Sequence, residues 1–146
     1  MKTKNRKLHI LLVEDSPSDI MLIRRSFDRS KLDHTLYCVE DGEKAIAFLK
    51  QQDEYKKAVC PDLIILDLNL PRLDGREVLA QIKQDSKLKR IPVVVLTTSS
   101  AKQDVMSSYN LHANCYIVKP FDVYDFLKIA NFIEQFWLKT VTLPSA

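Results

Sequence analysis

The sequence predicts an α/β protein in which helices cover both faces of a parallel sheet. Five short apolar runs alternate along the chain with segments of helical period. The central run, residues 62–71, reads DLIILDLNLP and lacks the polar alternation of a half-exposed strand, so we expect it to be buried on both faces. With 146 residues and 46% hydrophobic content, the chain suits one domain with a single core. We therefore expect a three-layer α/β/α domain with right-handed crossovers.

The five strands are expected at the apolar runs. In chain order these are residues 8–13, 36–39, 63–66, 93–96 and 115–118. Residues 53–61 are expected to form a longer loop before the central strand. No internal repeat, low-complexity stretch or linker divides the chain, so we interpret residues 1–146 as one domain with a core over about 7–138 and short tails.

The helices are predicted from capping residues and apolar spacing. Ser16 as N-cap, Pro17 at the first helical position and Asp19 at the third mark the start of the first helix. Its inward face carries Ile20, Ile23 and Phe27. The remaining helices are expected from residue 42 to about 52, from 75 onward, over 101–111 and from 123 to about 138.

The composition excludes several classes of protein. The net charge of +3 is modest, and the basic residues within positions 2–7 are typical of a solvated tail rather than a nucleic-acid contact. Cys38, Cys60 and Cys115 are odd in number and far apart, which indicates reduced thiols in a reducing compartment. Neither a membrane span nor a signal peptide is apparent. We expect a cytoplasmic protein that contacts neither nucleic acid nor membrane.

Polar side chains follow the carboxyl ends of four expected strands. Glu14 and Asp15 follow the first, Asp67 the third, Thr97 the fourth and Lys119 the fifth. Each has an ordinary explanation by itself, because acids begin helices, threonines form turns and lysines are solvated. Ligands of open α/β sheets bind at this edge, however, so the five residues together predict a functional site.

The residue types at this edge point to phosphoryl transfer with a metal ion. Three carboxylates in one crevice repel each other unless a cation lies between them. Oxygen ligands suit Mg²⁺, and the three histidines are too scattered to bind a transition metal. The metal and Lys119 would neutralise the phosphoryl oxygens, Thr97 would donate a hydrogen bond, and Asp67 would attack in line.

These motifs and their spacing resemble the receiver domain of two-component response regulators. The resemblance extends from about residue 7 to residue 138. It rests on the segments Glu14-Asp15, Leu66-Asp67-Leu68-Asn69-Leu70-Pro71, Asp74-Gly75, Leu96-Thr97 and Val118-Lys119-Pro120-Phe121. It implies the flavodoxin-like fold, with the parallel strands in the order 2-1-3-4-5 and five helices. It also implies a signalling phosphoacceptor that catalyses its own phosphorylation and dephosphorylation, rather than a conventional enzyme.

The resemblance assigns a role to each site residue. Asp67 would be the phosphoacceptor. Asp15, Asp67 and the backbone carbonyl of Asn69 would ligate Mg²⁺, and Glu14 would reach the metal through water. Many receivers have aspartate at the position of Glu14, a swap that adds a methylene and that we expect function to tolerate.

Lys119 would pair with the phosphoryl group, and its peptide bond to Pro120 would be cis, as in the family. A cis bond before proline is a minority state. Thr97 and Tyr116 would form the switch pair. In one place the sequence departs from the family, because His112-Ala113-Asn114 replaces the usual glycine-rich stretch before the last strand.

The end of the chain resembles the small response regulators that partner cyanobacterial phytochromes. The resemblance rests on residues 132–138, on Leu143-Pro144 and on the extended loop before the central strand. It implies phosphorylation by a phytochrome-type sensor histidine kinase. We expect no DNA-binding output domain after the fifth helix, so the output would act through protein contacts with a downstream protein that the sequence does not specify.

The fifth helix predicts a protein interface. Its apolar arc is about 240° wide, where a core-facing stripe needs little more than ~100°. The stripe expected to face the sheet consists of Val123, Phe126, Leu127, Ala130, Ile133 and Trp137. Ile129, Phe132 and Phe136 form a second, adjoining stripe. Either the segment with Val141 and Leu143 folds over this stripe, or the stripe forms a homodimer interface, which is the hypothesis we adopt.

Three other functions compete with the receiver hypothesis. A haloacid-dehalogenase-type phosphatase needs a second aspartate where this chain has Asn69. A Rossmann-type or flavodoxin-like nucleotide-binding module needs glycines in the first strand-to-helix turn, which here reads Asp15-Ser16-Pro17-Ser18. A pseudo-receiver that acts as a docking module without phosphorylation remains the main alternative, although such proteins usually lack one of the acidic or lysine residues, and here all are present.

Overall fold

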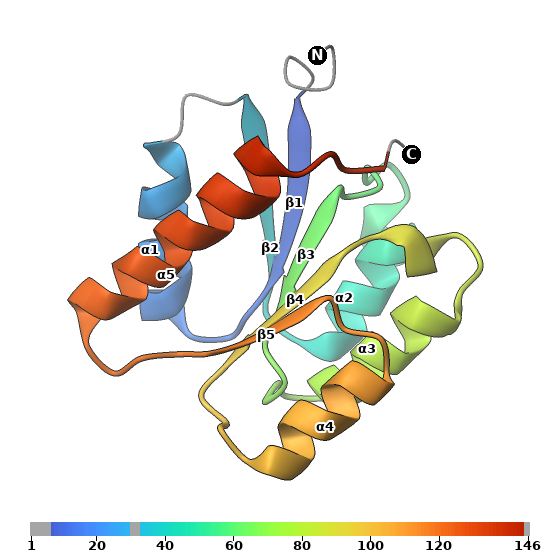
Figure 1. Cartoon of the computed structure of the whole chain (residues 1–146). Coiled ribbons are helices and arrows are strands. Elements are labelled where there is room, and N and C mark those ends of the chain that lie inside the picture. The colour runs from blue at the N-terminus through green and yellow to red at the C-terminus, as the bar shows by residue number, and fades with distance from the viewer. Residues whose placement is uncertain (1–6, 30–32, 145–146) are drawn as a thin grey trace.

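Five parallel strands form one sheet in the order β2-β1-β3-β4-β5 in the computed structural model, as predicted (Figure 1). The structure describes residues 7–29 and 33–144. The strands are β1 (Leu8–Val13), β2 (His34–Val39), β3 (Leu63–Leu66), β4 (Val93–Thr97) and β5 (Cys115–Val118). β2 begins two residues earlier than expected, because the start of β1 offers it a partner: Leu8 pairs with His34.

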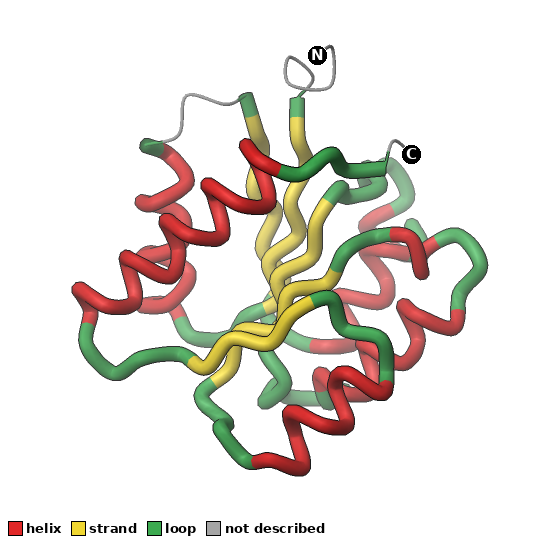
Figure 2. The backbone as a smooth tube through the Cα atoms, viewed as in Figure 1, coloured by secondary structure: helices red, strands yellow, loops and turns green. Residues whose placement is uncertain are grey.

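Helices cover both faces of the sheet (Figure 2). They are α1 (Pro17–Asp28), α2 (Gly42–Leu49), α3 (Gly75–Gln84), α4 (Lys102–Asn110) and α5 (Val123–Ile133). Two short 3₁₀ turns, η2 (Asp53–Tyr55) and η3 (Leu88–Arg90), precede β3 and β4. Figure 1 shows α1 and α5 on one side of the sheet and α2, α3 and α4 on the other. No helix in the described part of the chain has both the length and the apolar character needed to span a membrane.

The core has two halves because successive side chains of a strand point to opposite faces. Leu11 and Val13 belong to the cluster that includes residues of α2 and α3, such as Phe48 and Leu79. Ile10 and Leu12 belong to the cluster that includes Ile23 and Phe27 of α1 and Phe126 of α5. The central strand β3 is buried along its whole length, as its unbroken apolar run predicts.

In the turn between α4 and β5, a histidine occupies a backbone position where glycine is usual. His112 adopts a positive φ of 71°, a conformation that favours glycine. Its N–H donates to the Tyr109 carbonyl at 2.9 Å, and the Ala113 N–H donates to the Ser108 carbonyl at 3.0 Å. These two bonds make a Schellman motif, which normally has glycine at the position of His112.

The end of the fifth helix differs from the expected regular helix to about residue 138. α5 ends at Ile133 and continues as a π-helix, η4 (Glu134–Thr140). The wider turn also buries Leu138, five residues after Ile133, while Trp137 is half-buried against the same core cluster. The following segment packs back on the core, because Leu143 is also buried, so the core extends beyond residue 138.

Candidate phosphoryl-transfer site

Three carboxylates meet at the carboxyl edge of the sheet. One oxygen from each of Glu14, Asp15 and Asp67 lies within 4.8 Å of the others. Glu14 and Asp67 are buried, and Asp15 is exposed. This small set of hard oxygen donors, open to solvent on the side of Asp15, fits a divalent cation that keeps part of its water shell.

Strand register brings the acids together. Val13 of β1 pairs with Leu66 of β3, so the residues that follow each strand leave the sheet at the same level. The Asp67 N–H donates to the Val13 carbonyl at 3.0 Å, which fixes the strand ends to each other. Gly75 is required beside this site, because a Cβ there would lie 2.2 Å from the Asp67 backbone oxygen.

Lys119 reaches the same cluster from the end of β5. Its Nζ lies 2.7 Å from Glu14 Oε1 and 3.0 Å from Asp67 Oδ2. It also lies 2.8 Å from Asp19 Oδ2, in the first turn of α1. The sequence indicates Asp19 only as a helix-start residue, and its contact with Lys119 is a feature of the site that spacing alone does not predict.

Burial and charge shift the pKa values of the buried groups. Burial raises the pKa of Glu14 to about 7, against the opposing effects of the hydrogen bond and charge of Lys119. Burial by itself would lower the pKa of Lys119, but the hydrogen bonds to Asp19 and Glu14 outweigh it and raise the pKa above its usual value. Lys119 is therefore a permanent cation in this cluster.

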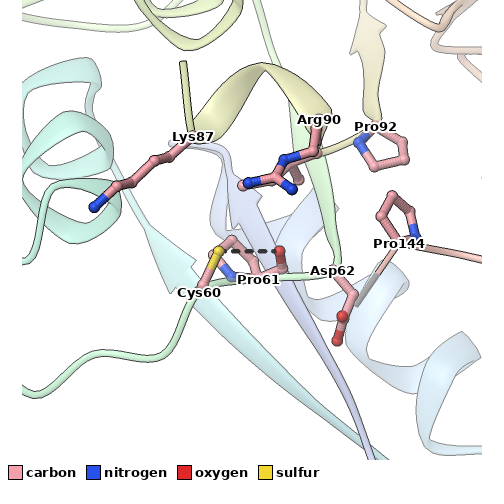
Figure 3. A pocket seen from close by; sticks show the side chains of 8 residues that line it. Cys60, Pro61, Asp62, Lys87, Arg90, Pro92 and Pro144 are labelled. Carbon is pink, nitrogen blue, oxygen red and sulfur yellow. Dashed lines mark hydrogen bonds between the residues drawn. The ribbon is translucent and has the colours of Figure 1, made fainter. Parts of the chain in front are cut away.

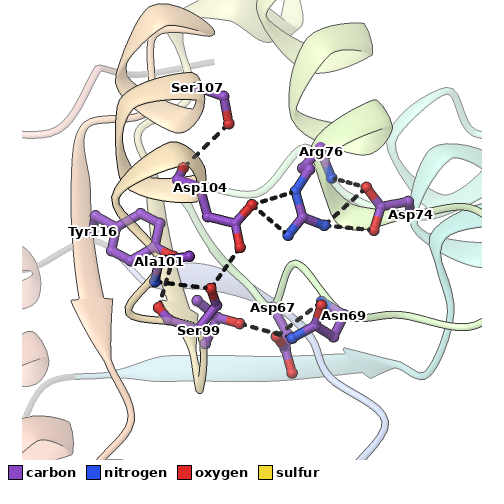
Figure 4. A network of polar contacts seen from close by, with 10 residues as sticks. Asp67, Asn69, Asp74, Arg76, Ser99, Ala101, Asp104, Ser107 and Tyr116 are labelled. Atoms are coloured by element: carbon purple, nitrogen blue, oxygen red, sulfur yellow. Dashed lines mark hydrogen bonds and ion pairs between the residues drawn. The ribbon is translucent and has the colours of Figure 1, made fainter.

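Thr97 and Asn69 lie beside Asp67. Thr97 ends β4 and is fully buried. The Asn69 backbone N–H donates to Asp67 Oδ1 at 3.2 Å, and its side-chain amide donates to Thr97 Oγ1 at 3.5 Å. The loop after β3 thus connects the acid to the hydroxyl in the structure (Figure 4).

A polar network continues from the loop after β4 to α3 and α4 (Figure 4). The Tyr116 hydroxyl donates to the Ser99 carbonyl at 2.8 Å, and the Ser99 hydroxyl donates to Asp104. The Arg76 guanidinium binds Asp104 of α4 and Asp74, the N-cap of α3. The sequence did not indicate Arg76 and Asp104, since a single arginine and an acid in a weak helix carry no distinctive pattern.

The expectation of a cis bond between Lys119 and Pro120 is wrong for this structure, in which no described peptide bond is cis. Trans is the lower-energy isomer of a bond before proline by about 0.5–1 kcal/mol. The Lys119 N–H donates to the Thr97 carbonyl at 2.7 Å, so the end of β5 stays paired, and Nζ reaches the acids from this trans backbone.

The predicted interface residues of α5 have different surroundings. Phe132 and Phe136 are 51% and 39% exposed and stack on each other with ring centroids 5.8 Å apart. Ile129 is half-buried against the core cluster that contains residues of α1, so it is not part of a fully exposed stripe. Val123, expected on the inward face, is 58% exposed in the first turn of α5. Val141 and Leu143 pack on the core but leave the two phenylalanines exposed.

A cavity of about 220 Å³ lies at the opposite edge of the sheet (Figure 3). It is lined by residues that precede β3 and β4 and by the C-terminal segment, namely Cys60, Pro61, Asp62, Lys87, Arg90, Ile91, Pro92 and Pro144. None of the acids described above lines it. Because ligands of parallel α/β sheets bind at the carboxyl ends of the strands, we assign this cavity no part in phosphoryl transfer.

Comparisons with known proteins agree with this geometry. The family described as the response regulator receiver domain matches residues 10–131. Response regulator Rcp1 of Synechocystis sp. is 56% identical over 94% of this chain and 93% of its own length.

Two solved structures are similar along nearly their whole length. The Mn²⁺-bound form of response regulator Rcp1 has a TM-score of 0.93 at 55% identity and covers 94% of this chain and 99% of its own. The phosphorylated cyanobacterial phytochrome response regulator RcpA has a TM-score of 0.94 at 52% identity and covers 96% of this chain and 100% of its own.

Proposed function

Because this chain belongs to the receiver-domain family of response regulators, we propose that a histidine kinase phosphorylates it on Asp67 in the presence of Mg²⁺. The observation that carries the proposal is the contact of Lys119 with two of the three clustered acids. A buried lysine beside a carboxylate and an acidic cation site provides the charge that phosphoryl transfer to the carboxylate needs.

Each residue has a defined task in the proposed reaction. Glu14, Asp15 and Asp67 would hold the cation, with the Asn69 carbonyl as a further ligand and Glu14 acting through water. The bound Mg²⁺ would neutralise charge that develops on the phosphoryl oxygens. An Asp67 oxygen attacks the phosphorus in line, while the bond from phosphorus to the kinase imidazole nitrogen breaks and that nitrogen keeps the electron pair.

Lys119 and Thr97 would act on the transferred group. The Lys119 ammonium donates a hydrogen bond to a phosphoryl oxygen and offsets its charge. The buried Thr97 hydroxyl donates to another, and in doing so draws the loop after β4 toward Asp67. Tyr116 is bonded to that loop through Ser99, so a shift of the loop would change the position of the Tyr116 ring.

The kinase partner we propose is of the phytochrome type. RcpA, which is 52% identical over nearly the whole chain, is a phytochrome response regulator. Receiver phosphorylation takes place in the cytoplasm, where we place this protein. Self-catalysed phosphorylation from small donors and self-catalysed dephosphorylation would belong to the same site.

The first experiment measures phosphorylation of Asp67 directly. We expect a histidine kinase, or a small phosphodonor such as acetyl phosphate, to label the wild type in Mg²⁺ and to leave the Asp67→Asn variant unlabelled. Chelator should abolish the labelling. Stable label on another residue of the variant, or equal labelling in chelator, would contradict the proposal and favour a docking module that works without phosphorylation.

We also propose a two-fold symmetric homodimer through the aromatic face of α5. Phe132 and Phe136 stack and stay exposed, which is costly for a monomer, and half-buried Ile129 lies on the same helix. Phosphorylation would strengthen the dimer through Thr97 and Tyr116.

Sedimentation tests the dimer. We expect the phosphorylated wild type to dimerise and a Phe132→Glu, Phe136→Glu double variant to remain monomeric while still being phosphorylated. A phosphorylated wild type that stays monomeric, or a double variant that dimerises equally well, refutes the interface.

A further inference from the structure

Asp19 shares Lys119 with the phosphoryl-transfer site but lies outside the three-acid cluster. It occupies the third position of α1, after the N-cap Ser16. Its Oδ2 is 2.8 Å from Lys119 Nζ, between the 2.7 Å contact of Glu14 and the 3.0 Å contact of Asp67. An acid at this helix position needs no lysine, because a helix N-terminus already favours negative charge. The contact therefore suggests a role at the site.

The hydrogen-bonding capacity of Lys119 is already full. An ammonium group has three N–H donors. Glu14, Asp19 and Asp67 each accept one contact at 3.0 Å or less. A phosphoryl group brings a charge of roughly −2 and three further acceptor oxygens. Phosphorylation turns the Asp67 carboxylate into an uncharged acyl group, which frees one N–H of Lys119 for the phosphoryl group. A second contact between Lys119 and the phosphoryl group requires the release of Glu14 or Asp19.

Burial decides which carboxylate is released. The Glu14 side chain is only 2% exposed and belongs to the acid cluster. A carboxylate left unpaired at such a depth is costly. The Asp19 side chain is 22% exposed, so water can replace the lysine as its partner. Asp19 is thus the acid that Lys119 can release at the lowest cost.

We propose that Asp19 is a positioning residue that holds Lys119 in the unphosphorylated protein and releases it to the phosphoryl group on Asp67. This inference rests on the proposed function. It predicts that Asp19 has opposite effects on the affinities of the site for its two ligands, Mg²⁺ and the phosphoryl group. The negative charge of Asp19 offsets that of Lys119 and so favours a cation between the acids, whereas it competes with a phosphoryl group for the ammonium and repels it.

The test compares Asp19→Asn with a matched control, Asp125→Asn. Asp125 is the acid in the first turn of α5, after the N-cap Asp122, so both variants remove one charge from a helix N-terminus at the same edge of the sheet. Calorimetry measures Mg²⁺ binding first. Beryllofluoride, which bonds to the aspartate and stands in for the phosphoryl group, is then titrated at saturating Mg²⁺.

We expect Asp19→Asn to weaken Mg²⁺ binding about three- to tenfold and to tighten beryllofluoride binding by a similar factor, as suits a partly exposed charge pair. Asp125→Asn should change neither, and Asp19→Glu, which keeps the charge, should move both values back toward the wild type. Unchanged affinities, a loss of both, or equal shifts in the control overturn the inference. If the wild type binds both ligands, such a result leaves the proposed function standing, whereas a wild type that binds Mg²⁺ but no beryllofluoride overturns both.

Discussion

At the scale of the residue, Glu14 is the group whose environment departs most from that of a surface acid. It is 1% exposed, lies beside Asp15 and Asp67, and shares Lys119 with Asp67 and Asp19. Its pKa of about 7 in the folded protein exceeds its ordinary value of 4.5, mainly because of burial. Between these values the folded state binds more protons than the unfolded state, so the free energy of unfolding falls as pH rises.

This sign gives a prediction for the metal-free protein. The contribution of Glu14 to the free energy of unfolding is fully present below about pH 4.5 and is lost as the pH rises through about 7. We expect urea unfolding in chelator to show a loss of about 2–3 kcal/mol between pH 5 and pH 8. Lys119 adds no slope there, because its raised pKa lies far above this range. Glu14→Gln should flatten the profile, and equal slopes in the two proteins would contradict the assignment.

At the scale of the element, the residue that follows the C-cap of α4 has a side chain that its backbone conformation disfavours. His112 holds the positive φ that the Schellman motif requires, at the position where glycine is preferred. A side chain in this left-handed conformation costs about 1–2 kcal/mol, part of which is returned by its restriction of the unfolded chain. We expect His112→Gly to raise the free energy of unfolding by about 0.5–1 kcal/mol. Its control is His34→Gly, which lies in β2 and should destabilise the protein. A His112→Gly variant less stable than the wild type would show that contacts of the imidazole stabilise the protein by more than the backbone strain destabilises it.

At the scale of the whole molecule, the acid cluster makes stability depend on metal. The unfolded chain has no assembled site, so Mg²⁺ should stabilise the folded protein by mass action. At pH 8 and about 100 times the dissociation constant the gain is about 2.7 kcal/mol, or a rise of about 5–10 °C in the melting temperature. Asp15→Ala should remove most of the rise, since Asp15 is the exposed member of the cluster and its loss leaves the core intact. A wild-type melting temperature that saturating Mg²⁺ leaves unchanged would count against a metal site.

The sequence by itself determined the layers, the strands and the edge at which the polar residues gather. These features depend on apolar spacing and on capping residues, which are local properties. The apolar run of β3 indicates a buried strand, and Ser16-Pro17 indicates the start of α1, without any knowledge of tertiary contacts. The family resemblance added the strand order, which the sheet confirms.

Only the tertiary structure decided which polar groups touch. Asp19 meets Lys119 because the start of α1 and the end of β5 converge at one edge of the sheet, although the two residues lie far apart in the chain. Arg76 meets Asp104 because α3 and α4 lie on the same face. The π turn after Ile133 buries Leu138 in addition to the half-buried Trp137, which helical periodicity cannot foresee because it assumes one constant turn. Contacts between elements depend on packing energies summed over the whole core, and no local pattern contains them.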